Sequence, residues 1–162
     1  MAVKRQVIAC VDAGLADYEM MAARSLAGQI FAEIGVTIEW RLTLRGCPTG
    51  GIAIRLSDRI PPMARSSALG MSQPYEGRQI TLFYRRIRRY RAYMLTAVMG
   101  HVLAHEIAHN LQGIDRHSES GLMKAHWQNA DFARMSVNPL RFTKEDIELI
   151  HDGLDRRPLA LQ

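Results

Sequence analysis

Residues 105–123 read His-Glu-Ile-Ala-His-Asn-Leu-Gln-Gly-Ile-Asp-Arg-His-Ser-Glu-Ser-Gly-Leu-Met, and this stretch is the most informative part of the chain. His105 and His109 are four residues apart, so on a helix they project from the same face, one turn apart. At this spacing two imidazole nitrogens can bind one zinc ion, and Glu106 stands beside them as a candidate general base. A catalytic zinc site keeps its fourth position for water, so three protein ligands are expected, and His117 is the candidate for the third. The stretch therefore predicts a catalytic zinc site.

The sequence on either side of this motif supports a helix in the required place. Leu95, Val98 and Val102 recur at helical spacing on the same face as the two histidines, which predicts a helix over residues 91–112. Gly113 follows directly and suits a sharp change of direction, where a positive φ is often needed. The chain can thus turn back toward the first two ligands after the helix ends.

The other histidines do not extend this metal site. His101 lies on the same predicted face, but about 12 Å separates it from His109 along a helix. Both residues could hardly bind the same ion with His105 between them, so we expect His101 to have a packing or supporting role. His126 and His151 show no comparable spacing and are expected to be surface or core residues.

These residues resemble the metzincin metallopeptidases, and among them most closely the matrixins. That family has His-Glu-x-x-His-x-x-Gly-x-x-His followed by a methionine turn. The resemblance implies that Met123 is this methionine, a hydrophobic floor beneath the zinc, although a plain core methionine is the alternative. It also implies a zincin-like α+β fold. No calcium site, structural zinc site or propeptide cysteine switch of the matrixin kind is visible in the sequence.

The spacing departs from the family pattern at the third ligand. The family positions of the glycine and of the third ligand fall here on Gln112 and Asp115. Gly113 and His117 come one and two residues later. Asp115 is therefore an alternative ligand, as some small metzincins use aspartate there, but we favour His117 because His117-Ser118 and the following Gly-Leu-Met align together.

The remaining sequence predicts an α/β-like N-terminal half and a C-terminal helix. Asp17 can cap a helix that stops at Gly35, between a buried strand and an alternating strand, as in a βαβ unit. Thr143 begins a capping pattern for the last helix. Residues 58–79 read as loop around a short extended piece, and residues 113–141 as irregular. The predicted strands are residues 6–11, 36–42, 52–56, 68–72 and 80–84.

Length and composition indicate one domain, residues 1–162, with 48% hydrophobic residues. No apolar run is long enough to span a membrane, and the N-terminus does not look like a signal peptide, so the chain is cytoplasmic or a trimmed secreted form. Cys10 and Cys47 could pair, but a buried free thiol is the commoner state of a residue like Cys10. The net charge of +5 owes much to residues 85–91, where arginines alternate with aromatic residues. A solvated connection is the favoured interpretation of that run.

The predicted function is zinc-dependent endopeptidase activity on peptide or protein substrates, by a monomer. A zinc-bound water would attack the scissile carbonyl, and Glu106 would transfer its proton. Substrate is expected to pair with an exposed sheet edge near residues 69–72, and residues 124–128, which include Trp127, are candidates for a pocket wall. Two alternatives remain. One is a zinc-stabilised binding module without catalysis, and the other is a nucleic-acid-binding protein that uses the run from Arg85 to Arg91.

Overall fold

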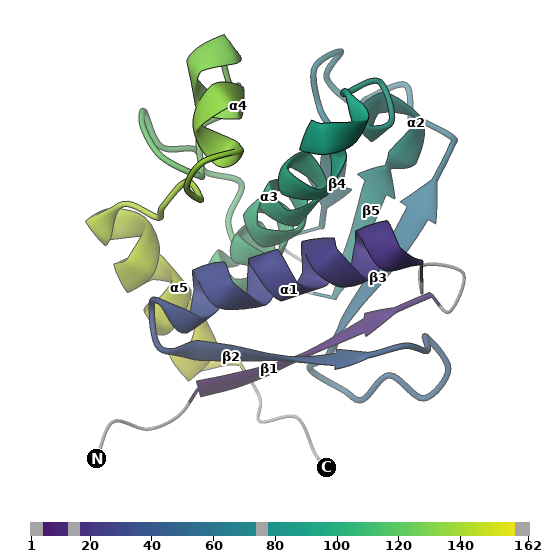
Figure 1. The fold of residues 1–162 in the computed structure, drawn as a ribbon. Coiled ribbons are helices and arrows are strands. Elements are labelled where there is room, and N and C mark those ends of the chain that lie inside the picture. Colours follow the sequence, from purple (N-terminus) through teal and green to yellow (C-terminus); the bar gives the residue numbers. More distant parts are fainter. Residues whose placement is uncertain (1–4, 13–16, 74–77, 158–162) are drawn as a thin grey trace.

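A computed structural model describes residues 5–12, 17–73 and 78–157, and Figure 1 shows its arrangement. A five-stranded sheet has the order β2-β1-β3-β5-β4. Four strands run parallel, and β4 runs antiparallel to β5 at one edge. The strands are β1 (Arg5–Val11), β2 (Val36–Arg41), β3 (Ile52–Ser57), β4 (Gly70–Ser72) and β5 (Gln79–Phe83).

The first three elements form the predicted βαβ unit. Helix α1 (Tyr18–Ala32) joins β1 to β2, and those strands pair in parallel with Val7 opposite Ile38. Asp17 caps the helix, because its carboxylate accepts a hydrogen bond of 2.9 Å from the backbone of Met20. The predicted N-cap is therefore confirmed.

Helix α3 (Ala92–Gln112) is the central element, and every residue from Val98 to Gln112 is buried. It packs against α1, β4 and β5 and against α5 (Lys144–Arg156), as Figure 1 shows. A helix segment that is buried on all sides needs apolar residues around its circumference, and most of the residues from Val98 to Gln112 are accordingly apolar. None of the described helices is long and apolar enough to cross a bilayer.

The C-terminal helix begins as predicted. The Thr143 side chain accepts a hydrogen bond from the backbone of Asp146, and the Asp146 carboxylate accepts one from the backbone of Thr143. This reciprocal capping box satisfies two backbone donors that a helix start leaves without partners.

Two expectations about local structure were wrong. Residues 113–141 are not wholly irregular, because α4 (Asn129–Met135) forms there, and a capping box between Gln128 and Asp131 starts it. A four-residue helix, α2 (Tyr84–Ile87), also occupies part of the predicted connection. The short extended piece predicted at residues 68–72 is confirmed, because residues 70–72 form β4, whereas residues 74–77 of the predicted loop lie outside the described residues.

Cys10 is not the free buried thiol that we favoured. It forms a disulfide with Cys47, with Cα atoms 6.0 Å apart. Cys47 lies in the turn between β2 and β3, the two neighbours of β1, which explains how residues 37 positions apart meet. The disulfide therefore joins β1 to the connection between its two neighbouring strands.

Candidate metal centre

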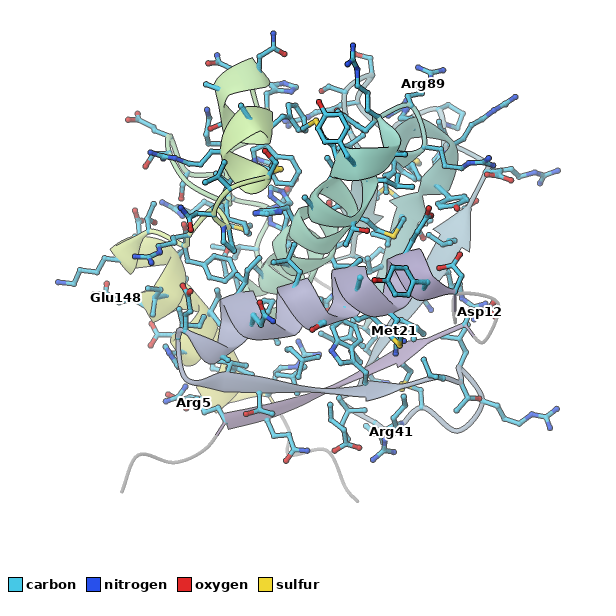
Figure 2. The ribbon with its side chains drawn as sticks, in the orientation of Figure 1. Arg5, Asp12, Met21, Arg41, Arg89 and Glu148 are labelled. Carbon is cyan, nitrogen blue, oxygen red and sulfur yellow. A yellow bond between two sulfur atoms is a disulfide. The ribbon has the colours of Figure 1, made fainter. Side chains whose placement is uncertain are left out.

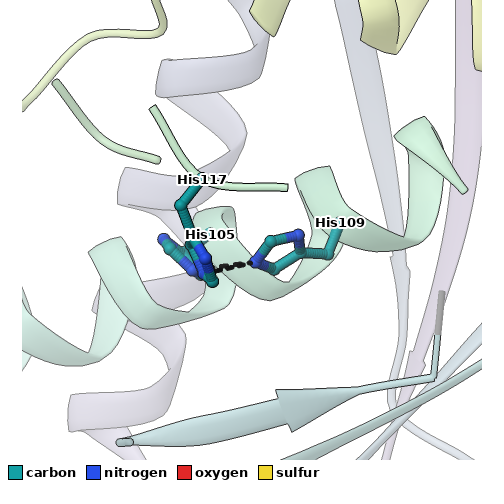
Figure 3. A group of neighbouring side chains, drawn as sticks. All are labelled: His105, His109 and His117. Carbon is teal, nitrogen blue, oxygen red and sulfur yellow. Dashed lines mark hydrogen bonds between the residues drawn. The ribbon is translucent and has the colours of Figure 1, made fainter. Parts of the chain in front are cut away.

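Three imidazoles converge at the C-terminal half of α3, as Figure 3 shows. His105 and His109 come from that helix, and His117 comes from the segment that follows it. Gly113 ends the helix with φ 71°, in the left-handed region, so the predicted turn at this glycine is confirmed. The turn returns the chain toward the helix, and the structure therefore brings the three histidines into one group.

The ring atoms that face one another are the three Nε2 nitrogens. His109 Nε2 lies 3.1 Å from His105 Nε2 and 3.2 Å from His117 Nε2. Tetrahedral zinc with bonds of about 2.0–2.1 Å would hold its nitrogen ligands roughly 3.3 Å apart. The spacing of the three nitrogens thus fits a zinc ion.

Backbone carbonyls fix the orientation of two of the rings. His105 Nδ1 lies 3.0 Å from the Leu122 carbonyl, and His109 Nδ1 lies 3.3 Å from the Ile114 carbonyl. A carbonyl oxygen only accepts, so each Nδ1 carries the proton and a neutral ring keeps a lone pair at Nε2. Orientation of a ligating imidazole through its other nitrogen is typical of metal sites.

Burial keeps these imidazoles neutral. It lowers the pKa of His105 to about 3, with a further contribution from neighbouring His109. It lowers the pKa of His109 to about 4, and the pKa of His117 is lowered in the same direction, although Asp115 opposes that change. Two lone pairs then face each other at 3.1 Å between His105 and His109 with no proton between them. A cation at this point would relieve that repulsion, so the donor set fits a metal ion.

Glu106 lies beside this group and against the edge strand. Its side chain is 7% exposed, and a Cβ placed on Gly70 of β4 would lie 3.0 Å from its Cγ. Burial, with a smaller contribution from Asp115, raises the pKa of Glu106 to about 8, and a hydrogen bond from the backbone of Ser72 opposes the rise. A divalent cation at the imidazoles would favour the carboxylate form.

The structure places Asp115 in the same cleft as the histidines but outside the group of converging ligand atoms. Met123 is fully buried in the core, and its carbonyl accepts a hydrogen bond of 2.8 Å from the backbone of Ser118. This hydrogen bond closes the turn between His117 and Met123. The same turn presents the Leu122 carbonyl to His105.

His101 does not join the group, as predicted. Its Nδ1 donates to the Ala97 carbonyl at 2.6 Å, and its Nε2 accepts from the Leu140 backbone at 2.9 Å. With both ring nitrogens engaged, His101 joins α3 to the segment before α5. His126 instead lies in the cleft, where its Nδ1 is 2.8 Å from the Ser67 hydroxyl.

The histidines open into a cleft of about 520 Å³, the size of a ligand site. Loop 63–69 and β4 form one wall, and residues 124–127 form another, in agreement with the predicted pocket wall. Trp127 stands 5.6 Å from the His105 ring, and Tyr90 stacks on Phe132 at 4.9 Å. The sequence does not predict that Tyr90 and Phe132 line this cleft, because their contact depends on α4.

The fold is similar to that of archaemetzincin from Methanopyrus kandleri, known from a crystal structure. The TM-score is 0.66, and the match covers 96% of this chain and 99% of that chain at 14% identity. At this identity the likeness shows the fold, which confirms the predicted zincin-like α+β class with its twisted sheet. No protein-family model matches the chain, and no curated protein matches it.

Proposed function

We propose that this protein is a zinc-dependent endopeptidase of the metzincin kind. The observation that carries the proposal is the convergence of three imidazoles in a cleft that Glu106 also lines. The likeness in fold is to a protein named as a metzincin, which supports the same conclusion. The closer resemblance to matrixins depends on the order of the motif alone.

His105, His109 and His117 are the proposed ligands, with Asp115 as the alternative to His117. Zinc at this position supplies a Lewis acid, which lowers the pKa of water toward about 7 and polarises a carbonyl. His117 is preferred because its Nε2 faces the other two ligand nitrogens, whereas Asp115 lies outside their group. Met123 is proposed as the hydrophobic floor of the site, since it is buried at the end of the turn that carries His117.

Glu106 is the proposed general base and acid. Its carboxyl group lies between the imidazoles and β4, where it can take a proton from an attacking water and deliver it to the leaving amine. Glu106 is only 7% exposed, which limits the access of bulk water to this proton transfer.

The substrate is proposed to be an extended peptide along β4. This strand pairs only with β5 among the described residues, so its other side presents backbone groups that a peptide can pair with. Backbone pairing would bring a scissile bond alongside Glu106, because the backbone of Ser72 in the same strand donates a hydrogen bond to that carboxyl group.

Zinc content and peptide cleavage test the proposal together. Glu106→Gln should retain zinc and lose about 10²- to 10⁴-fold of the cleavage rate, the usual contribution of a general base. His117→Ala should lose zinc affinity, while Asp115→Asn should keep it. If the zinc-loaded wild type cleaves nothing in a broad peptide library, the endopeptidase proposal fails and the protein is better described as a zinc-stabilised binding module.

A further inference from the structure

The cleft carries more positive than negative side chains. Its cationic groups lie mainly on one wall, and its carboxyl groups lie near the histidines. The lining contains Arg65, Arg86, Arg89 and Lys124 against Glu106 and Asp115.

Two of these cations already have partners. Lys124 forms an ion pair of 2.6 Å with Asp131. Arg86 donates through Nη1 to the carbonyls of Arg65 and Ala68, both at 2.6 Å, and thereby holds loop 63–69 against α2. Neither side chain is therefore available to move toward a ligand.

The other two cationic side chains of the cleft, those of Arg65 and Arg89, are available to a ligand. Arg65 and Arg89 are exposed, and neither has a carboxylate within ion-pair distance in the part of the chain that the structure describes. The Arg86 hydrogen bonds place the two residues on the same wall, because Arg65 is in the loop and Arg89 follows α2. Figure 2 labels Arg89 at the edge of the molecule beside α2.

We propose that this wall selects peptides with an acidic side chain, which Arg65 and Arg89 receive as specificity-determining residues. The proposal rests on the endopeptidase function above and names its substrate class. A guanidinium without an internal carboxylate partner does not have to break an existing ion pair when a substrate carboxylate binds. Within a cleft, water and salt screen the attraction between the two charges less than they do on an open surface.

An acidic peptide explains the arrangement better than a nucleic acid does. Glu106 and Asp115 sit in the same cleft and would repel a continuous phosphate backbone, whereas a peptide brings one carboxylate to the wall and a neutral backbone to β4. Beside the cleft, Arg85 and Arg88 line a second hollow that also contains Arg89 and the carboxylate of Asp58, so an acidic group interrupts the basic run there as well.

Fluorescence anisotropy with the full, zinc-loaded chain tests the proposal independently of turnover. All proteins carry Glu106→Gln, so that labelled peptides bind without cleavage and the missing carboxylate is common to every comparison. The probes are matched eight-residue peptides that carry Glu or Gln at each position in turn. Arg65→Ala and Arg89→Ala are compared with Arg85→Ala, which removes an equal charge from the outer hollow.

At the preferred position the Glu peptide should bind about fivefold to twentyfold more tightly than the Gln peptide. Arg65→Ala and Arg89→Ala should each reduce this ratio about twofold to fivefold, as expected for ion pairs with partly exposed groups, and together they should abolish it. Arg85→Ala should leave the ratio unchanged.

Equal binding of Glu and Gln peptides at every position would overturn the proposal, whether or not the wild type cleaves peptides. Equal losses in all three arginine variants would overturn it too. Binding of a single-stranded oligonucleotide that Arg85→Ala weakens as much as Arg89→Ala does would assign the basic run to nucleic acid instead. Absence of cleavage together with a Glu preference would refute only the endopeptidase function.

Discussion

Replacement of Asp146 by Ala should destabilise the protein by about 4 kcal/mol. The Asp146 carboxylate is completely buried and joins the loop after His117 to the start of α5. It accepts hydrogen bonds from the Ser118 hydroxyl at 2.6 Å, the Thr143 hydroxyl at 2.7 Å and the Thr143 backbone at 2.9 Å. It also accepts one from Arg116 at 3.0 Å.

The expected loss in free energy of unfolding is the sum of the contributions from these hydrogen bonds. The helix cap, which includes the Thr143 hydroxyl and backbone, contributes about 1 kcal/mol, and the hydrogen bond from the half-buried Ser118 hydroxyl to the charged carboxylate contributes about 2 kcal/mol. The Arg116 contribution is discounted to about 1 kcal/mol, because its side chain is 28% exposed and also pairs with Glu145. The total lies within the range of roughly 3–5 kcal/mol for breaking a buried ion pair.

Urea unfolding of the metal-free protein, followed by circular dichroism in the presence of a chelator, measures this change without a contribution from zinc binding. Thr143→Ala is the matched control, because it removes the capping hydroxyl and leaves the carboxylate in place, and it should cost only about 1 kcal/mol. If Asp146→Ala costs no more than Thr143→Ala, the buried carboxylate does not hold the loop and the helix together.

Three further predictions concern stability and are checked by the same unfolding measurement. Burial alone would raise the pKa of Asp146, but its hydrogen bonds from Ser118, Thr143 and Arg116 outweigh burial and hold the pKa below its usual 3.8. The stabilisation from this carboxylate is therefore fully present above about pH 4 and is lost as the pH falls through the lower native pKa. The difference in free energy of unfolding between the wild type and Asp146→Asn should accordingly shrink in acid. A difference that grows as the pH falls would show that the native pKa is not lowered. Gly113→Ala should cost about 1–2 kcal/mol because of the left-handed φ of 71°, and Gly113→Asn should cost less; equal stability of all three proteins would exclude strain at this position. Reduction of the Cys10–Cys47 bond, which closes a loop of 37 residue positions, should lower the free energy of unfolding by about 4 kcal/mol, and a midpoint that a reductant leaves unchanged would show that the bond constrains nothing.

The local features of the fold could be predicted because each depends on a few neighbouring residues. Asp17 and Thr143 act as helix caps, and Gly113 ends α3, through contacts within four residues. The spacing of His105 and His109 likewise fixes their common face. Such features can be inferred from the sequence because the chain itself holds the partners at a known separation.

The features that depend on distant partners could not be predicted. Arg116 and Asp146 are 30 residues apart, and nothing in either local sequence identifies the other. The Cys10–Cys47 pair depends on the parallel order of the strands, and Tyr90 meets Phe132 only because α4 exists. Helix α4 itself is seven residues long, too short for its periodicity to stand out from the surrounding loop.

The two borders of the sheet also bear on self-association. An open strand edge invites pairing with another molecule, and proteins counter this with short strands or with charged residues at the edge. Here β4 offers only the three residues Gly70–Ser72, and the opposite border, β2, carries the ion pair between Glu39 and Arg41 at 2.9 Å. The border formed by β4 is therefore too short to template an aggregate, and the charged pair protects the border formed by β2.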